Sequence, residues 1–145
     1  MPELPFTGER FTPECVREIW YEHVHRYALA RPIAAGKRVL DIACGEGYGS
    51  AMIAPVARTV TGIDIGTDAI AHARSRYRLL PNLNFREGDA TRFDAGGERY
   101  DLVLSFETLE HVEAQDGLVG GIAAALADDG CALISSPDKA VYSDV

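Results

Sequence analysis

The sequence predicts an α/β fold in which helices cover a parallel β-sheet. From Lys37 onward, short apolar runs alternate with segments whose apolar residues recur at helical spacing, a pattern typical of strand–helix units around a parallel sheet. The composition agrees, because 47% of the 145 residues are apolar and 25% are charged, as is usual for globular domains. A chain of this length has the size of one domain, so we expect a single domain over residues 1–145.

Residues 1–36 precede this pattern, and we expect them to form an arm and a helix in front of a core at 37–145. Residues 1–12 contain two prolines and isolated aromatic residues without periodicity, which favours an extended arm. Thr12 and Pro13 suit the cap and the first position of a helix. Apolar residues then recur at helical spacing up to Pro32: Val16, Ile19, Trp20, Val24 and Tyr27. We interpret this helix face as part of the core.

Five short strands are expected after Lys37, at residues 39–43, 59–64, 83–87, 100–106 and 131–136. Helical spacing appears between the second and third strands at Ile70, Ala73, Tyr77 and Leu80, and between the fourth and fifth at Leu118, Ile122, Ala125 and Leu126. Pro55 is expected to end or kink the helix after the first strand. Gly120 and Gly121 should weaken the last helix by about 1 kcal/mol each relative to alanine.

The charge of the chain argues against nucleic acid and membrane surfaces as partners. With 14 basic and 22 acidic residues the net charge is −8, which disfavours sequence-independent binding to phosphate backbones and anionic lipid. We interpret the densest group of basic residues as a solvated helix face rather than a nucleic-acid patch; it comprises Arg74, Arg76 and Arg78, with Arg86 and Arg92 further on.

The cysteines and the hydropathy pattern favour a cytoplasmic protein. Cys15, Cys44 and Cys131 are odd in number and widely spaced, so they form neither a disulfide framework nor a metal motif. The chain begins without an apolar leader, and no apolar stretch reaches the length of a membrane span. We therefore expect no targeting segment and no membrane partner.

The segment most informative about function is a glycine-rich turn after the first strand. Residues 39–49 run from an apolar strand into Gly45, Gly47 and Gly49. Glycine there permits a tight backbone and close approach of a ligand, and the helix that follows offers unpaired N–H groups. In an open α/β sheet this turn lies at the carboxyl ends of the strands, where ligands bind. The alternative is a tight turn without a ligand.

Two aspartates at the ends of the next strands favour the ligand-binding alternative. Asp64 ends the second strand, 17 residues after Gly47, where a carboxylate can accept two hydrogen bonds from a ribose diol. Asp89 follows the third strand and is placed to accept from the exocyclic amine of a base. Either aspartate alone would more often form a cap or a turn. Together with the glycine turn, they predict a nucleoside site.

These segments resemble the class I S-adenosylmethionine-dependent methyltransferases over most of residues 37–137. Residues 41–49 are similar to the family's first motif, with Ala43 in place of the commoner glycine, and Asp64 matches its ribose-binding acid. Residues 88–90 resemble the adenine-side motif, and residues 106–112 resemble the segment that borders the methionine half of the cofactor and the acceptor. Residues 7–14 and 25–27 resemble the lead-in of bacterial methyltransferases found near polysaccharide genes.

The resemblance implies a Rossmann-like, doubly wound, mostly parallel sheet of about five strands in the order 3-2-1-4-5. It implies S-adenosylmethionine as the cofactor, bound by Asp41, Ala43, Cys44, Gly45, Gly47, Tyr48, Asp64, Ile65, Asp89, Ala90, Phe106 and Glu107. The expected acceptor is a small molecule or a saccharide. The family's sheet usually has a sixth and a seventh strand, so a chain that stops at Val145 is expected to be truncated or minimal. An exposed edge at the fifth strand would favour homo-oligomers.

Within this resemblance, His111 is the candidate general base, because it follows a strand end and an imidazole titrates near neutrality. The alternative is that His111 only packs or hydrogen-bonds near the cofactor. Glu107 is a candidate to orient the amino group of the cofactor. Arg10 and Arg26 could meet its carboxylate, although a surface salt bridge is the simpler interpretation of each.

Other classes of protein fit the sequence less well. A dinucleotide-binding oxidoreductase would place glycine or alanine at position 50, where Ser50 stands, and its third glycine would not fall at Gly49. A hydrolase with Cys44 as nucleophile would want glycines at the positions of Ile42 and Glu46, so Cys44 is expected to line the site, where a helix N-terminus would lower the pKa of its thiol. A cofactor-binding module without catalysis, or a fragment that needs a partner, remains an alternative.

A metal site is not expected. His23 and His25 are two residues apart on the expected helix, so their side chains point about 200° apart and cannot share an ion.

Overall fold

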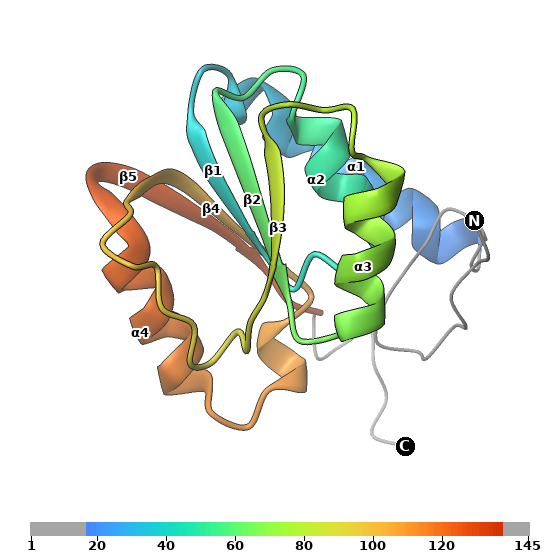
Figure 1. Cartoon of the computed structure of the whole chain (residues 1–145). Coiled ribbons are helices and arrows are strands. Elements are labelled where there is room, and N and C mark those ends of the chain that lie inside the picture. Colours follow the sequence, from blue (N-terminus) through green and yellow to red (C-terminus); the bar gives the residue numbers. More distant parts are fainter. Residues whose placement is uncertain (1–16, 138–145) are drawn as a thin grey trace.

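The computed structural model describes residues 17–137, which form a five-stranded sheet with helices on both faces (Figure 1). The elements in chain order are α1 (Arg17–Ala34), β1 (Arg38–Ile42), α2 (Tyr48–Ile53), β2 (Thr59–Asp64), α3 (Thr67–Arg76), β3 (Leu83–Glu87), β4 (Tyr100–Phe106), the short 3₁₀ helix η1 (Leu109–His111), α4 (Gln115–Ala125) and β5 (Leu126–Ser135). The strand order is β3-β2-β1-β4-β5 and all four pairings are parallel, which confirms the expected doubly wound sheet.

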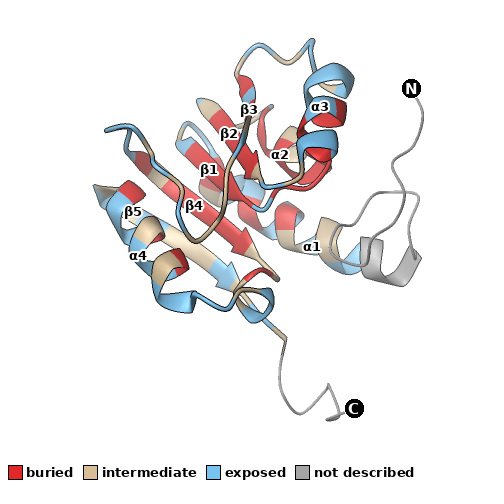
Figure 2. Cartoon of the chain, turned by 60° about the horizontal axis from the view of Figure 1, so that its bottom comes forward, coloured by how far each residue is buried: buried red, intermediate tan, exposed pale blue. Residues whose placement is uncertain are grey.

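Two apolar layers hold the sheet between the helices. On one face, Val39 and Leu102 pack with residues of α1, α2 and α3. On the other face, Leu40 and Val103 pack with Leu118 of α4. Successive residues of a strand point to opposite faces, and consecutive residues of β1 and β4 are buried, so both faces of these strands are covered. Figure 2 shows this burial concentrated in the central strands.

The predicted elements agree with the structure except at some of their ends. The bounds of β2, β3 and β4 are those expected, and α2 ends two residues before Pro55, as expected. The first helix does not end at Pro32 but continues to Ala34, since this proline lies in the last turn. The start expected at Thr12 lies outside the described residues.

The last helix and strand differ more from expectation. Leu126 does not belong to α4 but begins β5, because it pairs with Tyr100 before the pairing shifts register ahead of Leu102. Gly121 has a packing reason to be inside α4, since a Cβ there would lie 2.9 Å from the ring of Phe93. No such contact exists at Gly120.

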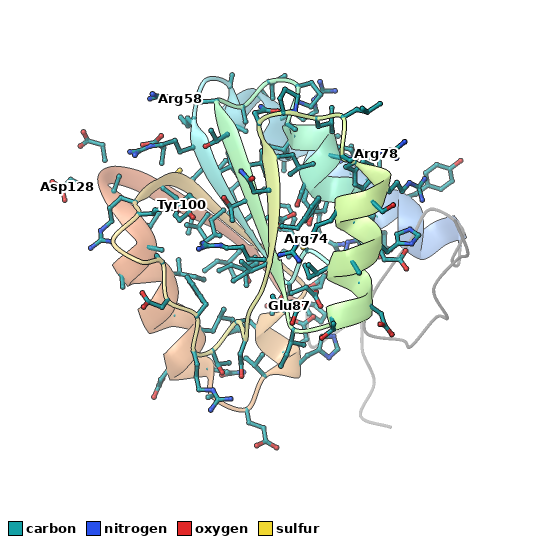
Figure 3. The ribbon with its side chains drawn as sticks, in the orientation of Figure 1. Arg58, Arg74, Arg78, Glu87, Tyr100 and Asp128 are labelled. Atoms are coloured by element: carbon teal, nitrogen blue, oxygen red, sulfur yellow. The ribbon has the colours of Figure 1, made fainter. Side chains whose placement is uncertain are left out.

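The basic residues of α3 do not gather into a binding patch. The guanidinium of Arg74 lies against β3 and donates to the carbonyl oxygen of Phe85 at 2.9 and 3.2 Å (Figure 3). This contact occupies an acceptor on the outer edge of the sheet, where an unpaired strand would otherwise be open to association. Arg78, two residues past the end of α3, donates to the carbonyl of Ser75 in that helix. Arg92 pairs with Asp89.

Across residues 17–137, no helix combines the length and apolar composition needed to cross a membrane.

Candidate functional site

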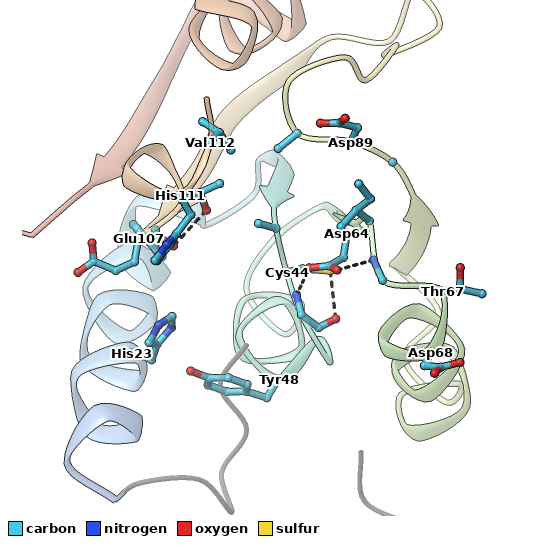
Figure 4. Close-up of a pocket in the computed structure, with 18 of the residues that line it drawn as sticks. His23, Cys44, Tyr48, Asp64, Thr67, Asp68, Asp89, Glu107, His111 and Val112 are labelled. Atoms are coloured by element: carbon cyan, nitrogen blue, oxygen red, sulfur yellow. Dashed lines mark hydrogen bonds between the residues drawn. The ribbon is translucent and has the colours of Figure 1, made fainter. Parts of the chain in front are cut away.

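A cavity of about 520 Å³ lies at the carboxyl edge of the sheet. Segments that follow four strands, together with α1, supply its walls (Figure 4). The residues that line it are His23, Tyr27, Ala43, Cys44, Gly45, Tyr48, Asp64, Ile65, Gly66, Thr67, Asp68, Gly88, Asp89, Ala90, Phe106, Glu107, Thr108, His111 and Val112. Its volume falls in the range typical of small-molecule sites.

The glycine turn takes the tight conformation that its sequence predicts. Ala43, Gly45 and Gly47 have φ angles of +57°, +58° and +88°, so three alternate residues occupy the left-handed region. A Cβ at Gly47 would lie 2.5 Å from the ring of Phe85, so this glycine also allows β3 to pack against the turn. Ala43 adopts a conformation that glycine would take at lower cost.

Asp64 fixes the turn from the neighbouring strand. Its Oδ2 accepts a hydrogen bond from the N–H of Gly45 at 2.9 Å, and its Oδ1 accepts from the N–H of Gly66 at 2.8 Å. A carboxylate can accept about four hydrogen bonds, so both oxygens retain capacity for a ligand. The next residue, Ile65, lines the same wall and leaves 72% of its surface exposed.

Asp89 forms the turn after β3 and also lines the cavity. Its Oδ1 accepts from the N–H of Thr91 at 2.9 Å and from the Thr91 hydroxyl at 2.7 Å. Hydrogen bonds from Thr91 to the ionised form hold the pKa of Asp89 below its usual value. Ala90 lies beside it on the cavity wall.

Two of the residues expected to contact the cofactor do not line the cavity. Gly47 belongs to the turn but is not among the lining residues, and Asp41 is fully buried in β1. The hydroxyl of Ser50 donates to Asp41 Oδ2 at 2.6 Å, and the hydroxyl of Tyr27 lies 3.1 Å from both carboxylate oxygens. Burial raises the pKa of Asp41 to about 7, although these two hydrogen bonds act to lower it.

The segment after β4 carries the other expected residues. Phe106, Glu107 and His111 all line the cavity, the last from η1. Glu107 has a φ of +55°, and its Oε1 lies 2.6 Å from Arg26 Nη2. Burial raises the pKa of Glu107, while Arg26 opposes that shift. His111 keeps 60% of its side chain exposed, with Nε2 3.5 Å from Glu110 Oε1.

From α1, the sequence suggested only Arg26 as a contact of the cofactor, and Arg26 does not line the cavity. His23 and Tyr27 line it from α1, and Thr67 and Asp68 line it from the start of α3. Burial, and next the charge of Arg26, lowers the pKa of His23 to about 4, so the imidazole is neutral at neutral pH. In the structure, Gly49 makes room for α1, since a Cβ there would lie 2.1 Å from the ring of Tyr27.

Cys44 lines the cavity as expected, but its thiol is not activated. Burial raises the pKa of Cys44, as do the nearby carboxylates of Asp41 and Asp64. The alternative left open by the sequence, a Cys44 thiol whose pKa is lowered by a helix N-terminus, does not hold, because desolvation outweighs that effect. Within residues 17–137, no group of three or more His, Cys, Asp or Glu side chains could hold a metal ion.

Comparisons with known proteins identify the family of the chain. A family model described as a methyltransferase domain matches residues 39–130. A probable S-adenosylmethionine-dependent methyltransferase of Mycolicibacterium smegmatis is 34% identical over 97% of this chain and 54% of its own length. A ubiquinone biosynthesis O-methyltransferase of Azorhizobium caulinodans is 32% identical over 88% of this chain and 51% of its own length. The crystal structure of the N-methyltransferase NodS of Bradyrhizobium japonicum in complex with S-adenosyl-L-homocysteine has a TM-score of 0.75. It is 22% identical, with coverage of 84% of this chain and 63% of that one, and shows the shared fold.

The chain therefore belongs to the methyltransferase-domain family, which confirms the resemblance seen in the sequence. It spans about half the length of the curated relatives that it matches.

Proposed function

We propose that this domain binds S-adenosylmethionine in the cavity and takes part in transfer of its methyl group to a small molecule or a saccharide. The observation that carries the proposal is the contact of Asp64 with the N–H of Gly45, which joins the acidic end of β2 to the glycine turn at the cavity wall. The match to the methyltransferase-domain family supports the cofactor. The relative named for ubiquinone biosynthesis supports a small-molecule acceptor.

The cavity residues fit an adenosine at one side. Asp64 would hold the ribose hydroxyls, since its oxygens are fixed by backbone donors and keep further acceptor capacity. Ile65 and Ala90 offer apolar surface for the base, and Asp89 offers a carboxylate for its amine. Phe106 and Glu107 would border the methionine half.

The charge of the lining favours a cationic ligand over a dinucleotide. Among the described residues that line the cavity, Asp64, Asp68, Asp89 and Glu107 are carboxylic acids and none is Lys or Arg. A sulfonium is attracted by such a lining, whereas the pyrophosphate of NAD would be repelled in a partly desolvated site. The electrostatics thus add to the sequence argument against an oxidoreductase.

When bound, the cofactor supplies a methyl group that is already activated for displacement. The protein must then position the acceptor, exclude water and, for a weakly acidic acceptor, remove a proton. His111 is our candidate for the proton acceptor, because it borders the cavity and its half-exposed imidazole is accessible to an incoming molecule. Cys44 does not serve as a nucleophile, since its buried thiol has a raised pKa.

The role of Asp64 is tested by calorimetric titration of variants with S-adenosylmethionine. Asp64→Ala also removes the acceptors of Gly45 and Gly66, so Asp64→Asn, which keeps one acceptor oxygen, is measured beside it. We expect Asp64→Ala to lose at least about a hundredfold in affinity and Asp64→Asn about tenfold, with folding checked by circular dichroism.

Asp101→Asn is the matched control for the Asp64 variants. This aspartate also accepts a backbone N–H, from Arg38 at 2.9 Å, but it lies at the start of β4, away from the cavity. The control should bind the cofactor as the parent does. If folded Asp64→Ala also bound like the parent, the ribose assignment would be wrong.

A further inference from the structure

Helix α1 forms one wall of the cavity and is joined to the sheet by two adjacent side chains. Arg26 Nη2 lies 2.6 Å from Glu107 Oε1, after the end of β4. The hydroxyl of Tyr27 lies 3.1 Å from both carboxylate oxygens of Asp41 in β1. One turn of α1 therefore contacts two neighbouring strands at the edge where the cavity opens.

Helix α1 packs against the segment around Gly49 through the ring of Tyr27. The ring of Tyr27 packs edge-on against Phe106, with centroids 5.0 Å apart, and against Tyr48 at 6.0 Å. Any Cβ at Gly49 would overlap the Tyr27 ring. Gly49 thus makes room for α1, Gly47 makes room for Phe85 of β3, and Gly45 lines the cavity.

Glu107 is held in a costly conformation by contacts on two sides. Its φ of +55° is unfavourable for a residue with a side chain, and such strain persists where the surroundings enforce it. The N–H of Glu107 donates to the carbonyl of Ser135 in β5 at 3.0 Å, and Arg26 holds the carboxylate. The ion pair is largely shielded, with side-chain exposures of 24% for Arg26 and 15% for Glu107. A shielded pair is screened less by salt than a surface pair.

The cavity has two ends of different chemistry. Figure 4 shows Asp64, Thr67 and Asp68 on the side of β2 and α3, and His23, Glu107 and His111 on the side of α1. If Asp64 holds the ribose, the rest of the cofactor extends toward α1.

We propose that Arg26 is a positioning residue for the amino-acid end of the cofactor, which it fixes by holding Glu107 in place at the α1 side of the cavity. This inference rests on the function proposed above. Arg26 does not line the cavity itself, so it acts through the carboxylate of Glu107. The carboxylate of Glu107, held in one orientation by Arg26, is then available to the amino group of the ligand.

The test compares two ligands with the same adenosine and the same S-methyl group, of which only one carries the amino-acid chain and the sulfonium charge. S-adenosylmethionine and 5′-methylthioadenosine share the adenosine, but the second lacks the amino acid. We expect Arg26→Met to weaken binding of S-adenosylmethionine by about tenfold and binding of 5′-methylthioadenosine by less than about twofold. Equal weakening of both ligands, or no weakening of either, would overturn the proposal, since a merely structural role does not distinguish them.

Arg31→Met is the matched control, because Arg31 lies in the last turn of the same helix and outside the cavity. It should bind both ligands like the parent. Arg26→Lys keeps a charged donor and should recover part of the affinity for S-adenosylmethionine. This variant also keeps the test decisive if Arg26→Met does not fold.

A double-mutant cycle tests whether Arg26 acts through Glu107. Glu107→Gln keeps the shape of the side chain and removes its charge. We expect Glu107→Gln to weaken S-adenosylmethionine binding in the parent, but to add little to Arg26→Met, because both changes remove the same oriented carboxylate. Additive losses would contradict the proposal. A parent chain that bound neither ligand would instead refute the proposed function, so the two failures are distinguishable.

Discussion

The hydroxyl of Tyr27 in α1 lies 3.1 Å from both oxygens of Asp41, a carboxyl group in β1 that is fully buried. Ser50 in α2 donates to the same carboxyl. Asp41 therefore links two helices to the central strand beneath the glycine turn. Its position behind the cavity indicates that the acid of this motif shapes the turn from below and does not line the cavity.

The buried state of Asp41 predicts a pH-dependent stability. Its pKa is about 7 in the folded chain against 3.8 for the free group, so between these values the folded chain holds a proton that the unfolded chain has released. Protonated Asp41 contributes its full share to the free energy of unfolding below about pH 4. This share is lost as the pH rises through 7, and the free energy of unfolding then falls by at most ~1.4 kcal/mol per pH unit.

We therefore expect the melting temperature of the parent to fall relative to that of Asp41→Asn between pH 5 and pH 8. Thermal unfolding followed by circular dichroism at unit pH steps measures this difference. Parallel pH profiles of parent and variant would show that Asp41 does not titrate in this range.

Replacement of Ala43 by glycine should stabilise the fold. Ala43 has a φ of +57°, where a side chain costs about 1–2 kcal/mol, and the greater freedom of glycine in the unfolded chain offsets about half of the gain. We expect Ala43→Gly to raise the free energy of unfolding by about 0.5–1 kcal/mol, measured by urea denaturation. A decrease would mean that the Ala43 methyl group makes packing contacts worth more than the strain.

Replacement by alanine should lower the free energy of unfolding at Gly49 and raise it at Gly120. A Cβ at Gly49 would lie between 2.1 and 2.5 Å from three ring atoms of Tyr27, so Gly49→Ala must displace α1 and should cost at least about 2 kcal/mol. Gly120 is exposed within α4 and has no atom within 4 Å of a Cβ, so Gly120→Ala should gain about 1 kcal/mol. Similar effects of the two substitutions would show that α1 does not pack on the turn as described.

Cys44 should be inert to alkylation. Burial raises the pKa of its thiol, so little thiolate is present at pH 7.5, whereas Cys131 on β5 is exposed. Iodoacetamide labelling followed by peptide mass spectrometry should modify Cys131 at least about tenfold faster than Cys44. Equal labelling rates would mean that Cys44 is more accessible and more acidic than the structure indicates.

Local patterns in the sequence were sufficient for most of the elements, because strands such as 59–64 and 100–106 are short segments rich in β-branched, aromatic or apolar residues that alternate with helical patterns. The strand order was implied by the family resemblance and not by any local pattern. The early start of β5 at Leu126 depends on its pairing with Tyr100, a contact between distant residues that no local pattern records.

The contact between α1 and the end of β4 could not be predicted for the same reason. The sequence suggested Arg26 and Glu107 separately as contacts of the cofactor, but these residues are 81 positions apart and no local pattern records that they pair with each other. Tyr27 was interpreted as a core residue, and it is buried, but its ring also lines the cavity and its hydroxyl contacts Asp41. Only the packing of α1 on the sheet shows that the Tyr27 side chain both lines the cavity and contacts Asp41.

Calorimetric titration of the 145-residue chain with S-adenosylmethionine, with NAD as the comparison ligand, tests the central claim most directly. An acidic cavity beside a glycine turn predicts saturable one-to-one binding of S-adenosylmethionine and no binding of NAD. Binding of NAD in preference, or of neither ligand by a chain shown to be folded, would contradict the assignment of the cavity as a cofactor site.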